Sequence, residues 1–237
     1  MEALLADWHR DHARDLPWRH TDDPYAVLVS EVMLQQTQVA RVIDRWTAWM
    51  ARWPAAEALA AAPRGEVIAA WSGLGYNRRA VGLHRAAQQI AADGWPDDLT
   101  VLPGVGRYTA DAVARFAHGA AVLPIDVNVR RVCERTGATF SPDSAAALMD
   151  LGATICIARV PRCGRCPLAE PCPSRGQRFQ PLRRQSRFEG SFRQQRAEAL
   201  RAITAAPRPL GTLDARVVEA LAADGLAEVD GSVVRLP

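Results

Sequence analysis

The chain has 237 residues, 49% of them hydrophobic, which is enough to bury a sizeable core in one or two compact domains with a small appendage. Its formal net charge of +3 is mildly basic, so composition alone neither requires nor excludes a nucleic-acid partner. It has neither a basic-then-apolar leader nor a run of about eighteen apolar residues, so we expect a cytoplasmic protein that does not span a membrane.

Helical periodicity dominates from Met1 to about Gly152 and strict alternation is scarce, so the fold class we predict is mainly α-helical. The helices expected before the cysteines are Glu2–His12, Tyr25–Met50, Ala55–Ala62, Arg64–Trp71, Asn77–Asp93, Asp97–Leu102, Arg107–His118, Asn128–Thr136 and Ser144–Ile155. The second of these is long enough to be two helices.

An acidic residue stands inside an apolar stretch of the second predicted helix. Glu31 lies in PYAVLVSEVMLQQTQV, where every other side chain is apolar or uncharged. Burial there would raise the pKa of its carboxyl group and allow it to deliver a proton to a leaving group. The alternative is an exposed glutamate on an amphipathic helix.

The motif GLGYNRR places Tyr76 in a glycine-flanked turn ahead of two arginines. Such a turn can push an aromatic wedge into a base stack, with cationic support. An ordinary turn between helices, with Tyr76 in the core, fits the local sequence nearly as well.

The motif LPGVGRYTA joins two apolar helical patterns. Gly104 and Gly106 permit positive φ and let the backbone around Val105 approach another surface closely. The next helix begins at this turn, so its unpaired N–H groups can face a phosphate of DNA.

Asp126 follows VLPI and precedes VNVRRV, which makes it a suitable N-cap. The helix N-terminus would lower the pKa of its carboxyl group and keep it ionised. An ionised Asp126, with Asn128 as a hydrogen-bond partner, could stabilise a developing oxocarbenium ion while Glu31 protonates the leaving base. A cap without a catalytic role is the alternative.

Four of the five cysteines follow a C-x6-C-x2-C-x5-C pattern in a proline-rich loop; they are Cys156, Cys163, Cys166 and Cys172. In a chain expected to be intracellular, they indicate thiolate ligands rather than disulfides. Four thiolates suit either a [4Fe-4S] cluster or tetrahedral zinc, and the single C-x2-C pair favours the cluster. It would organise a loop that presents Arg159, Arg162 and Arg165 to DNA.

Beyond the cysteines, seven arginines accompany one acid between Pro173 and Arg196, which suits either a phosphate backbone or a solvated linker. They are Arg175, Arg178, Arg183, Arg184, Arg187, Arg193 and Arg196. Helices over Ser191–Ala205 and Leu213–Asp224 and a hairpin turning at Asp230 and Gly231 then suggest a small winged-helix-like module. We therefore expect a core over residues 1–180 and a basic linker and tail over 181–237.

These motifs, in this order, resemble the helix-hairpin-helix glycosylase superfamily, and most closely its MutY-type adenine DNA glycosylases. The resemblance covers roughly Leu16–Cys172 and rests on LPWR, SEVMLQQTQV, GLGY, LPGVGRYTA, the D-x-N-V run, MDLGATIC and the cysteine spacing. It implies a two-lobed fold, with a six-helix lobe over about 22–125 and an iron-sulfur lobe from 1–21 and 126–180. It also implies a monomer that flips adenine out of mismatched or damaged double-stranded DNA.

The resemblance also assigns roles to residues. Glu31 would protonate the flipped adenine, and Asp126 would stabilise the sugar cation or its covalent adduct. The supporting catalytic positions are Tyr108, Asn128 and Arg19. The positions implied to contact DNA are Gln36, Thr37, Leu74 and Tyr76, which probe the opposite strand and its orphan base, and Gly104, Val105 and Gly106. Carbonyl groups near Val101 and Val105 would hold a monovalent or divalent cation.

All 29 basic residues are arginine. Arginine stays protonated, so the chain lacks the side-chain amine with which strand-cutting glycosylases attack C1′. Tyr108 stands where endonuclease III-like relatives carry their lysine, and the resemblance therefore implies a monofunctional enzyme. Related thymine mismatch glycosylases carry a similar hairpin, so a thymine or uracil mismatch glycosylase is an alternative.

Two departures from the family pattern matter. Only 29 residues separate Asp126 from Cys156, as though a helix were missing around Gly137–Ala147, which could loosen the support of Asp126. The short tail replaces the larger Nudix-like domain with which many relatives recognise 8-oxoguanine, so adenine opposite 8-oxoguanine or guanine is an expectation. A non-catalytic iron-sulfur DNA-binding regulator is the remaining alternative, although both carboxylates are retained.

Overall fold

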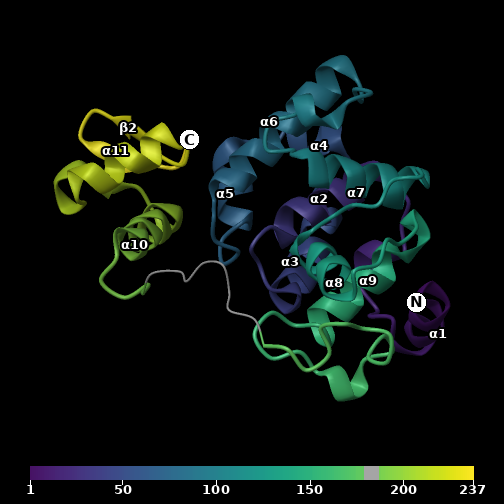
Figure 1. The fold of residues 1–237 in the computed structure, drawn as a ribbon. Helices are drawn as coiled ribbons and strands as arrows, with labels where there is room; N and C mark the ends of the chain where they lie inside the picture. The colour runs from purple at the N-terminus through teal and green to yellow at the C-terminus, as the bar shows by residue number, and fades with distance from the viewer. Residues whose placement is uncertain (179–186) are drawn as a thin grey trace. The chain divides into compact units, whose positions relative to one another are not determined.

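The computed structural model describes residues 1–178 and 187–237, and α-helices form most of it (Figure 1). The chain divides into two compact units, Met1–Val27 with Arg107–Arg184 and Leu28–Gly106 with Gln185–Pro237. No helix in the described ranges is both long enough and apolar enough to cross a membrane.

The first unit is built around two helices, α8 and α9, that pack against each other. Its elements are α1 (Glu2–His12), the short 3-10 helix η1 (Pro17–Arg19), α7 (Arg107–His118), α8 (Val127–Thr136), η3 (Pro142–Ser144), α9 (Ala145–Thr154) and η4 (Cys163–Arg165). The core of this unit buries Leu5 of α1, Val132 of α8, Leu148 of α9 and Leu168 of the cysteine loop. The N-terminal helix and the cysteine loop therefore share one core with the helix that follows Asp126.

The connection from α8 to α9 is short because a glycine ends α8. Gly137 adopts a left-handed conformation with φ of 65°, and its N–H donates to the carbonyl oxygen of Cys133. Only η3 is then needed before α9 begins. The segment that the sequence marks as shortened is thus a turn between two packed helices, and α8 keeps its support.

The second unit contains most of α2 (Pro24–Leu34) and the helices that follow it. These are α3 (Val39–Arg52), α4 (Ala56–Ala60), α5 (Arg64–Ala70), α6 (Arg78–Asp93) and the 3-10 helix η2 (Leu99–Val101). Trp49 meets Trp53 and Trp71 edge to face, with ring centroids 4.7 and 5.6 Å apart. Buried aromatic area of this kind stabilises helices as short as α4 and α5, which would not persist alone in water.

The C-terminal segment folds as two helices with a small sheet. Its elements are α10 (Phe192–Ala205), β1 (Arg208–Pro209), η5 (Leu210–Thr212), α11 (Ala215–Ala223), β2 (Glu228–Asp230) and β3 (Val233–Arg235). The sheet is antiparallel in the order β1-β3-β2, with Val229 opposite Val234. Val218 and Leu221 of α11 share a buried cluster with Ile68 of α5 and Val81 of α6.

Most predicted helices are confirmed to within a few residues, and Tyr25–Met50 is two helices. Asp97–Leu102 forms only the 3-10 helix η2, because Pro96 and Pro103 leave too little chain for an α-helix. The sequence does not predict strand β1, because its two residues are too few to show alternation. The grouping also differs from the expected one: α7 joins the first unit, and the tail joins the second because its apolar face packs on α5 and α6.

Candidate active site and thiol cluster

Asp126 is the N-cap of α8, and its carboxylate is held at three points. Its Oδ1 atom accepts hydrogen bonds from the backbone N–H groups of Asn128 (2.8 Å) and Val129 (2.6 Å). Its Oδ2 atom accepts one from the side-chain amide of Asn128 (2.7 Å). These donors fix the orientation of the carboxylate at the positive end of the helix dipole, where negative charge is favoured. The predicted cap is confirmed.

Asn128 is itself fixed by an arginine that the sequence did not single out. The Oδ1 atom of Asn128 accepts a hydrogen bond from Arg131 Nη2 (2.6 Å). The same guanidinium donates to the carbonyl oxygens of Gly152 (2.7 Å) and Cys156 (2.6 Å). Burial lowers the pKa of Arg131, partly offset by nearby negative charge. A continuous set of hydrogen bonds therefore joins Asp126 to the backbone of the first cysteine.

A glycine lets α9 approach α8 beside Asn128. A Cβ atom at Gly152 would lie 3.0 Å from the Asn128 carbonyl oxygen and 2.6 Å from the Asn128 Cβ, and the second distance is shorter than real Cβ contacts. The glycine of MDLGATIC is therefore needed for close packing against α8.

Arg19 of LPWR lies in an ion-pair cluster around Asp150. Its Nη1 and Nη2 atoms donate to the two carboxylate oxygens at 2.8 and 2.7 Å. Arg14 Nε donates to Oδ1 at 2.6 Å, and His9 Nε2 lies 3.2 Å from Oδ2. Burial alone would raise the pKa of this fully buried carboxyl group, but hydrogen bonds and charge from Arg19 and Arg14 outweigh it and lower the pKa to about 2. These contacts of Arg19 fix α9, the helix that carries Gly152.

Glu31 is buried in α2, with 6% of its surface exposed. Its neighbours along the helix, from Tyr25 to Met33, are all buried as well. The alternative of an exposed glutamate on an amphipathic helix is therefore wrong. Glu31 belongs to the second unit and Asp126 to the first.

The predicted hairpin residues follow η2. Gly104 adopts a φ of 82°, and its backbone lies against Gly82 of α6, where a Cβ on Gly104 would come within 3.7 Å of the Gly82 Cα. Val105 is buried, and its N–H donates to the carbonyl oxygen of Leu102 (3.1 Å). Tyr108 is half-buried in the first turn of α7.

The residues implied to probe the opposite strand lie on two loops of the second unit. Gln36 and Thr37 follow α2, whereas Leu74 and Tyr76 precede α6. Leu74 is buried, but Tyr76 is 44% exposed, so the alternative of a core tyrosine is wrong. The Thr37 hydroxyl lies 3.4 Å from the carbonyl oxygen of Leu74, and the two loops are therefore adjacent.

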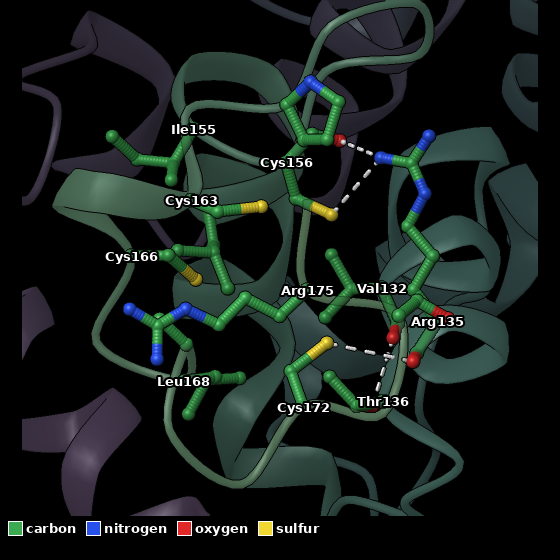
Figure 2. A pocket seen from close by; sticks show the side chains of 14 residues that line it. Val132, Arg135, Thr136, Ile155, Cys156, Cys163, Cys166, Leu168, Cys172 and Arg175 are labelled. Atoms are coloured by element: carbon green, nitrogen blue, oxygen red, sulfur yellow. Dashed lines mark hydrogen bonds between the residues drawn. The ribbon is translucent and has the colours of Figure 1, made fainter. Parts of the chain in front are cut away.

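The four spaced cysteines line a single pocket of the first unit (Figure 2). Its other walls include the apolar side chains of Val132, Leu151 and Leu168 and the guanidinium groups of Arg135 and Arg175. Burial, together with the neighbouring thiols, raises the pKa of the Cys166 thiol to about 11. A thiolate at Cys166 therefore needs nearby positive charge.

Hydrogen-bond donors also reach the sulfur atoms. Arg135 Nη1 lies 3.3 Å from Cys156 Sγ, and the Gly176 N–H lies 3.4 Å from Cys163 Sγ. Arg135 donates further to the carbonyl oxygens of Ile157 and Ala158 and so fixes the start of the loop. In the described residues, no group of three or more His, Cys, Asp or Glu side chains is arranged to hold a metal ion.

Comparison with known proteins identifies relatives of the chain. Residues 29–152 match the model of the HhH-GPD superfamily of base excision DNA repair proteins. Adenine DNA glycosylase from Mycolicibacterium smegmatis is 43% identical, over 94% of this chain and 91% of its own length. The enzyme of that name from Homo sapiens is 38% identical, over 72% of this chain and 38% of its own length.

Solved structures give the same fold. A thermostable thymine-DNA glycosylase superposes with a TM-score of 0.65 at 29% identity, covering 73% of this chain and 93% of its own. A trapped endonuclease III–DNA covalent intermediate has a TM-score of 0.62 at 23% identity, covering 71% of this chain and 91% of its own. At this identity, the similarity shows that the two proteins share a fold.

Proposed function

Since the chain belongs to the HhH-GPD superfamily of base excision DNA repair proteins, and within it to the adenine DNA glycosylases, we propose that it excises adenine mispaired with 8-oxoguanine or guanine by hydrolysing the N-glycosidic bond. The observation that carries the proposal is the carboxylate of Asp126, fixed by three donors at the N-terminus of α8. Its rigid orientation is what the stabilisation of a short-lived cation requires.

Asp126 acts on the sugar. As the bond between C1′ and the base breaks, positive charge develops on the deoxyribose ring. A carboxylate that is already oriented stabilises this charge without further reorganisation. Asn128 keeps both oxygens in place, and Arg131 keeps Asn128 in place.

Glu31 acts on the leaving base. The adenine anion is a poor leaving group, so the base leaves more readily once a ring nitrogen is protonated. A buried carboxylic acid is suited to supply that proton. Water then adds to the sugar cation and returns a proton to the Glu31 carboxylate, which leaves free adenine and an abasic site. The burial of Glu31 supports this role.

Reaching the bond requires the nucleotide to leave the helix stack. The exposed ring of Tyr76 is suited to fill the space that the base leaves. Arg159, Arg162 and Arg165 are exposed on the cysteine loop and are suited to contact the phosphate backbone.

The enzyme releases the base without cutting the strand. The chain contains no lysine, and Tyr108 occupies the position at which the resemblance places the lysine of strand-cutting relatives. A phenol cannot form the Schiff base that precedes strand cleavage. We expect strand breaks to appear only after alkali treatment.

We further propose that Cys156, Cys163, Cys166 and Cys172 hold a [4Fe-4S] cluster. Their convergence on one pocket and the N–H donors to two of the sulfur atoms support this assignment. When bound, the cluster supplies the positive charge that four half-buried thiolates need. The same loop carries the carbonyl group that anchors Arg131, so order in the loop extends to Asn128.

The test is a single-turnover assay on duplexes with adenine opposite 8-oxoguanine or guanine, and with thymine or uracil opposite guanine, with and without alkali. Adenine release with alkali-dependent breaks is the expected result. Thymine or uracil release would move the specificity to that of the thymine-DNA glycosylase with which the chain shares its fold. Tight binding without release of any base would contradict an enzymatic function.

Two substitutions test the assigned roles. Glu31→Gln and Asp126→Asn should each lower the single-turnover rate by about 100-fold or more, because one removes the proton donor and the other the fixed charge. Both keep the size of the side chain, so binding of a mismatched duplex should change little. A variant that retains the full rate would remove its residue from the mechanism. Asp111→Asn, on the surface salt bridge with Arg107, is the control that should leave the rate unchanged.

A further inference from the structure

The two loops implied to probe the opposite strand share an unusual backbone feature. Gln36 has a φ of 56° and Tyr76 a φ of 46°, and within residues 1–178 and 187–237 they are the non-glycine residues with positive φ. A side chain with a Cβ atom is disfavoured in this conformation, so both loops depend on contacts that hold them there.

One guanidinium group contacts both loops. Arg79, at the start of α6, donates from Nη1 to three carbonyl oxygens at the end of α2, those of Val32 (2.8 Å), Met33 (3.0 Å) and Gln35 (2.6 Å). Helix ends leave such carbonyl groups without partners, and a cation is favoured beside them. Arg79 therefore caps the helix that carries Glu31.

The rest of the guanidinium holds the second loop to the first. Arg79 Nη2 donates to the Thr37 hydroxyl (3.0 Å) and to the carbonyl oxygens of Leu74 (3.3 Å) and Gly75 (2.9 Å). Its Nε donates to the carbonyl oxygen of Tyr76 (3.3 Å), one of the two strained residues. The contacts thus span the backbone on both sides of the Tyr76 turn.

Charge and shape make this arrangement specific to arginine. The guanidinium lies 5.2 Å from the Trp71 ring centroid and 5.6 Å from that of Tyr76, within cation–π range. Burial lowers the pKa of Arg79 to about 10, which leaves it charged at neutral pH. Lysine, with its donors on one atom, cannot reach acceptors on both loops at once.

We propose that Arg79 is a positioning residue that sets opposite-base specificity, by holding the Gln36–Thr37 loop and the Leu74–Tyr76 loop in one arrangement before DNA binds. The proposal rests on the proposed function, since it concerns recognition of the strand opposite the adenine. Loops that are already ordered bind DNA without the entropic cost of ordering them, and they present a fixed shape to the orphan base.

The experiment compares Arg79→Lys and Arg79→Gln with wild type and with Arg85→Lys, an exposed arginine on the same helix. The first measurement is the ratio of single-turnover rates for adenine opposite 8-oxoguanine, guanine and cytosine. The second is the fluorescence of 2-aminopurine next to the orphan base at saturating protein, which reports unstacking by the wedge. The third is the melting temperature of each variant.

Both Arg79 variants should bind the mismatched duplex about tenfold or more weakly, because several hydrogen bonds at the loops are lost together. They should also lose rate discrimination among opposite bases and give a smaller 2-aminopurine signal, while Arg85→Lys behaves as wild type. Partial unfolding would lower every rate equally and leave the ratios unchanged. Unchanged ratios and an unchanged fluorescence signal in both Arg79 variants would overturn the proposal.

A double-substitution cycle with Tyr76→Ala gives an independent test. If Arg79 acts through the Tyr76 turn, Arg79→Lys should reduce discrimination little further once Tyr76 is absent, and additive effects would contradict this. The 2-aminopurine signal does not need bond cleavage. A wild-type protein that unstacks the base but releases no adenine would therefore contradict the proposed function. The fluorescence of the Arg79 variants would still test the role of Arg79.

Discussion

At the scale of single residues, the orientation of the Asp126 carboxylate depends on neighbouring side chains and on close packing. Asn128 orients the carboxylate, Arg131 orients Asn128, and Gly152 leaves the space that Asn128 occupies. Each contact is ordinary, but the orientation of Asp126 depends on all three. A substitution at Gly152 should therefore displace Asn128 and disturb the orientation of the Asp126 carboxylate.

Gly152→Ala tests this series. The added methyl group would meet the Asn128 Cβ, so α9 or Asn128 must shift, and we expect the free energy of unfolding to fall by about 1–3 kcal/mol. The single-turnover rate should fall as well, because the Asp126 carboxylate loses its fixed partner. Gly211→Ala is the matched control, since a Cβ there meets nothing within 4 Å. Normal stability and rate in Gly152→Ala would show that the close approach is dispensable.

At the scale of elements, ion pairs join segments that are far apart in sequence. Asp150 of α9 binds Arg14 and Arg19, which ties the chain after α1 to α9. Asp224, at the end of α11, bonds to Arg196 of α10 and lies 3.4 Å from Arg78 of α6. The second cluster connects the tail to the helix that begins beside the Tyr76 turn.

Asp224→Asn should loosen the tail. The substitution removes the charge that Arg78 and Arg196 share, and we expect a loss of about 1 kcal/mol in the free energy of unfolding, with a smaller difference at high salt. Urea unfolding at two ionic strengths measures this. Asp230→Asn, at the exposed pair with Arg235, should change stability little. Equal effects of the two substitutions would rule out a specific role for Asp224.

At the scale of the whole molecule, stability should fall as the solution becomes mildly acidic. Burial lowers the pKa of His84, and the charge of Arg64 acts in the same direction, against hydrogen bonds to the carbonyl groups of Ala62 and Ala60. His84 Nε2–H donates to Ala62, while Nδ1 is buried and has no hydrogen-bond partner in the described residues. Below the ordinary histidine value of 6.5, the unfolded chain therefore binds a proton that the folded chain does not.

His84→Gln should reduce the loss of folding stability that accompanies a fall in pH. Glutamine keeps a donor for the Ala62 carbonyl group but does not titrate, so its melting temperature should change less than that of wild type between about pH 8 and pH 5. His20→Gln, at an exposed histidine paired with Asp15, serves as the control. A wild-type curve as flat as that of His84→Gln would contradict the assignment.

The cysteine loop and the core of the first unit should also depend on each other. Leu168 from the loop is buried with Leu5, Val132 and Leu148, so an unsupported loop would open that core. We expect Cys166→Ser to lose bound iron and to lower the melting temperature, whereas Cys133→Ser, outside the loop, should keep its iron. Iron content and thermal unfolding measure the two effects. An iron-free variant with the melting temperature of wild type would show that the core of the first unit does not depend on the cysteine loop.

Much of the local structure follows from the sequence. Apolar periodicity predicts the helices, the D-x-N pattern predicts the cap at Asp126, and glycine positions predict the turns, because these depend on residues within a few positions of one another. The cysteine spacing predicts a shared site for the same reason. Absence of lysine is a property of the composition and excludes chemistry by a side-chain amine whatever the fold.

The long-range partners were decided only by the tertiary structure. Arg79, Arg131 and Arg135 donate mainly to backbone carbonyl groups, and every residue carries one, so no sequence pattern marks the acceptor. The burial of Glu31 and the exposure of Tyr76 likewise depend on which helices pack around them. The sequence determined which reactive side chains the protein has. The tertiary structure determined which of them have a fixed orientation, because their hydrogen-bond partners are distant along the chain.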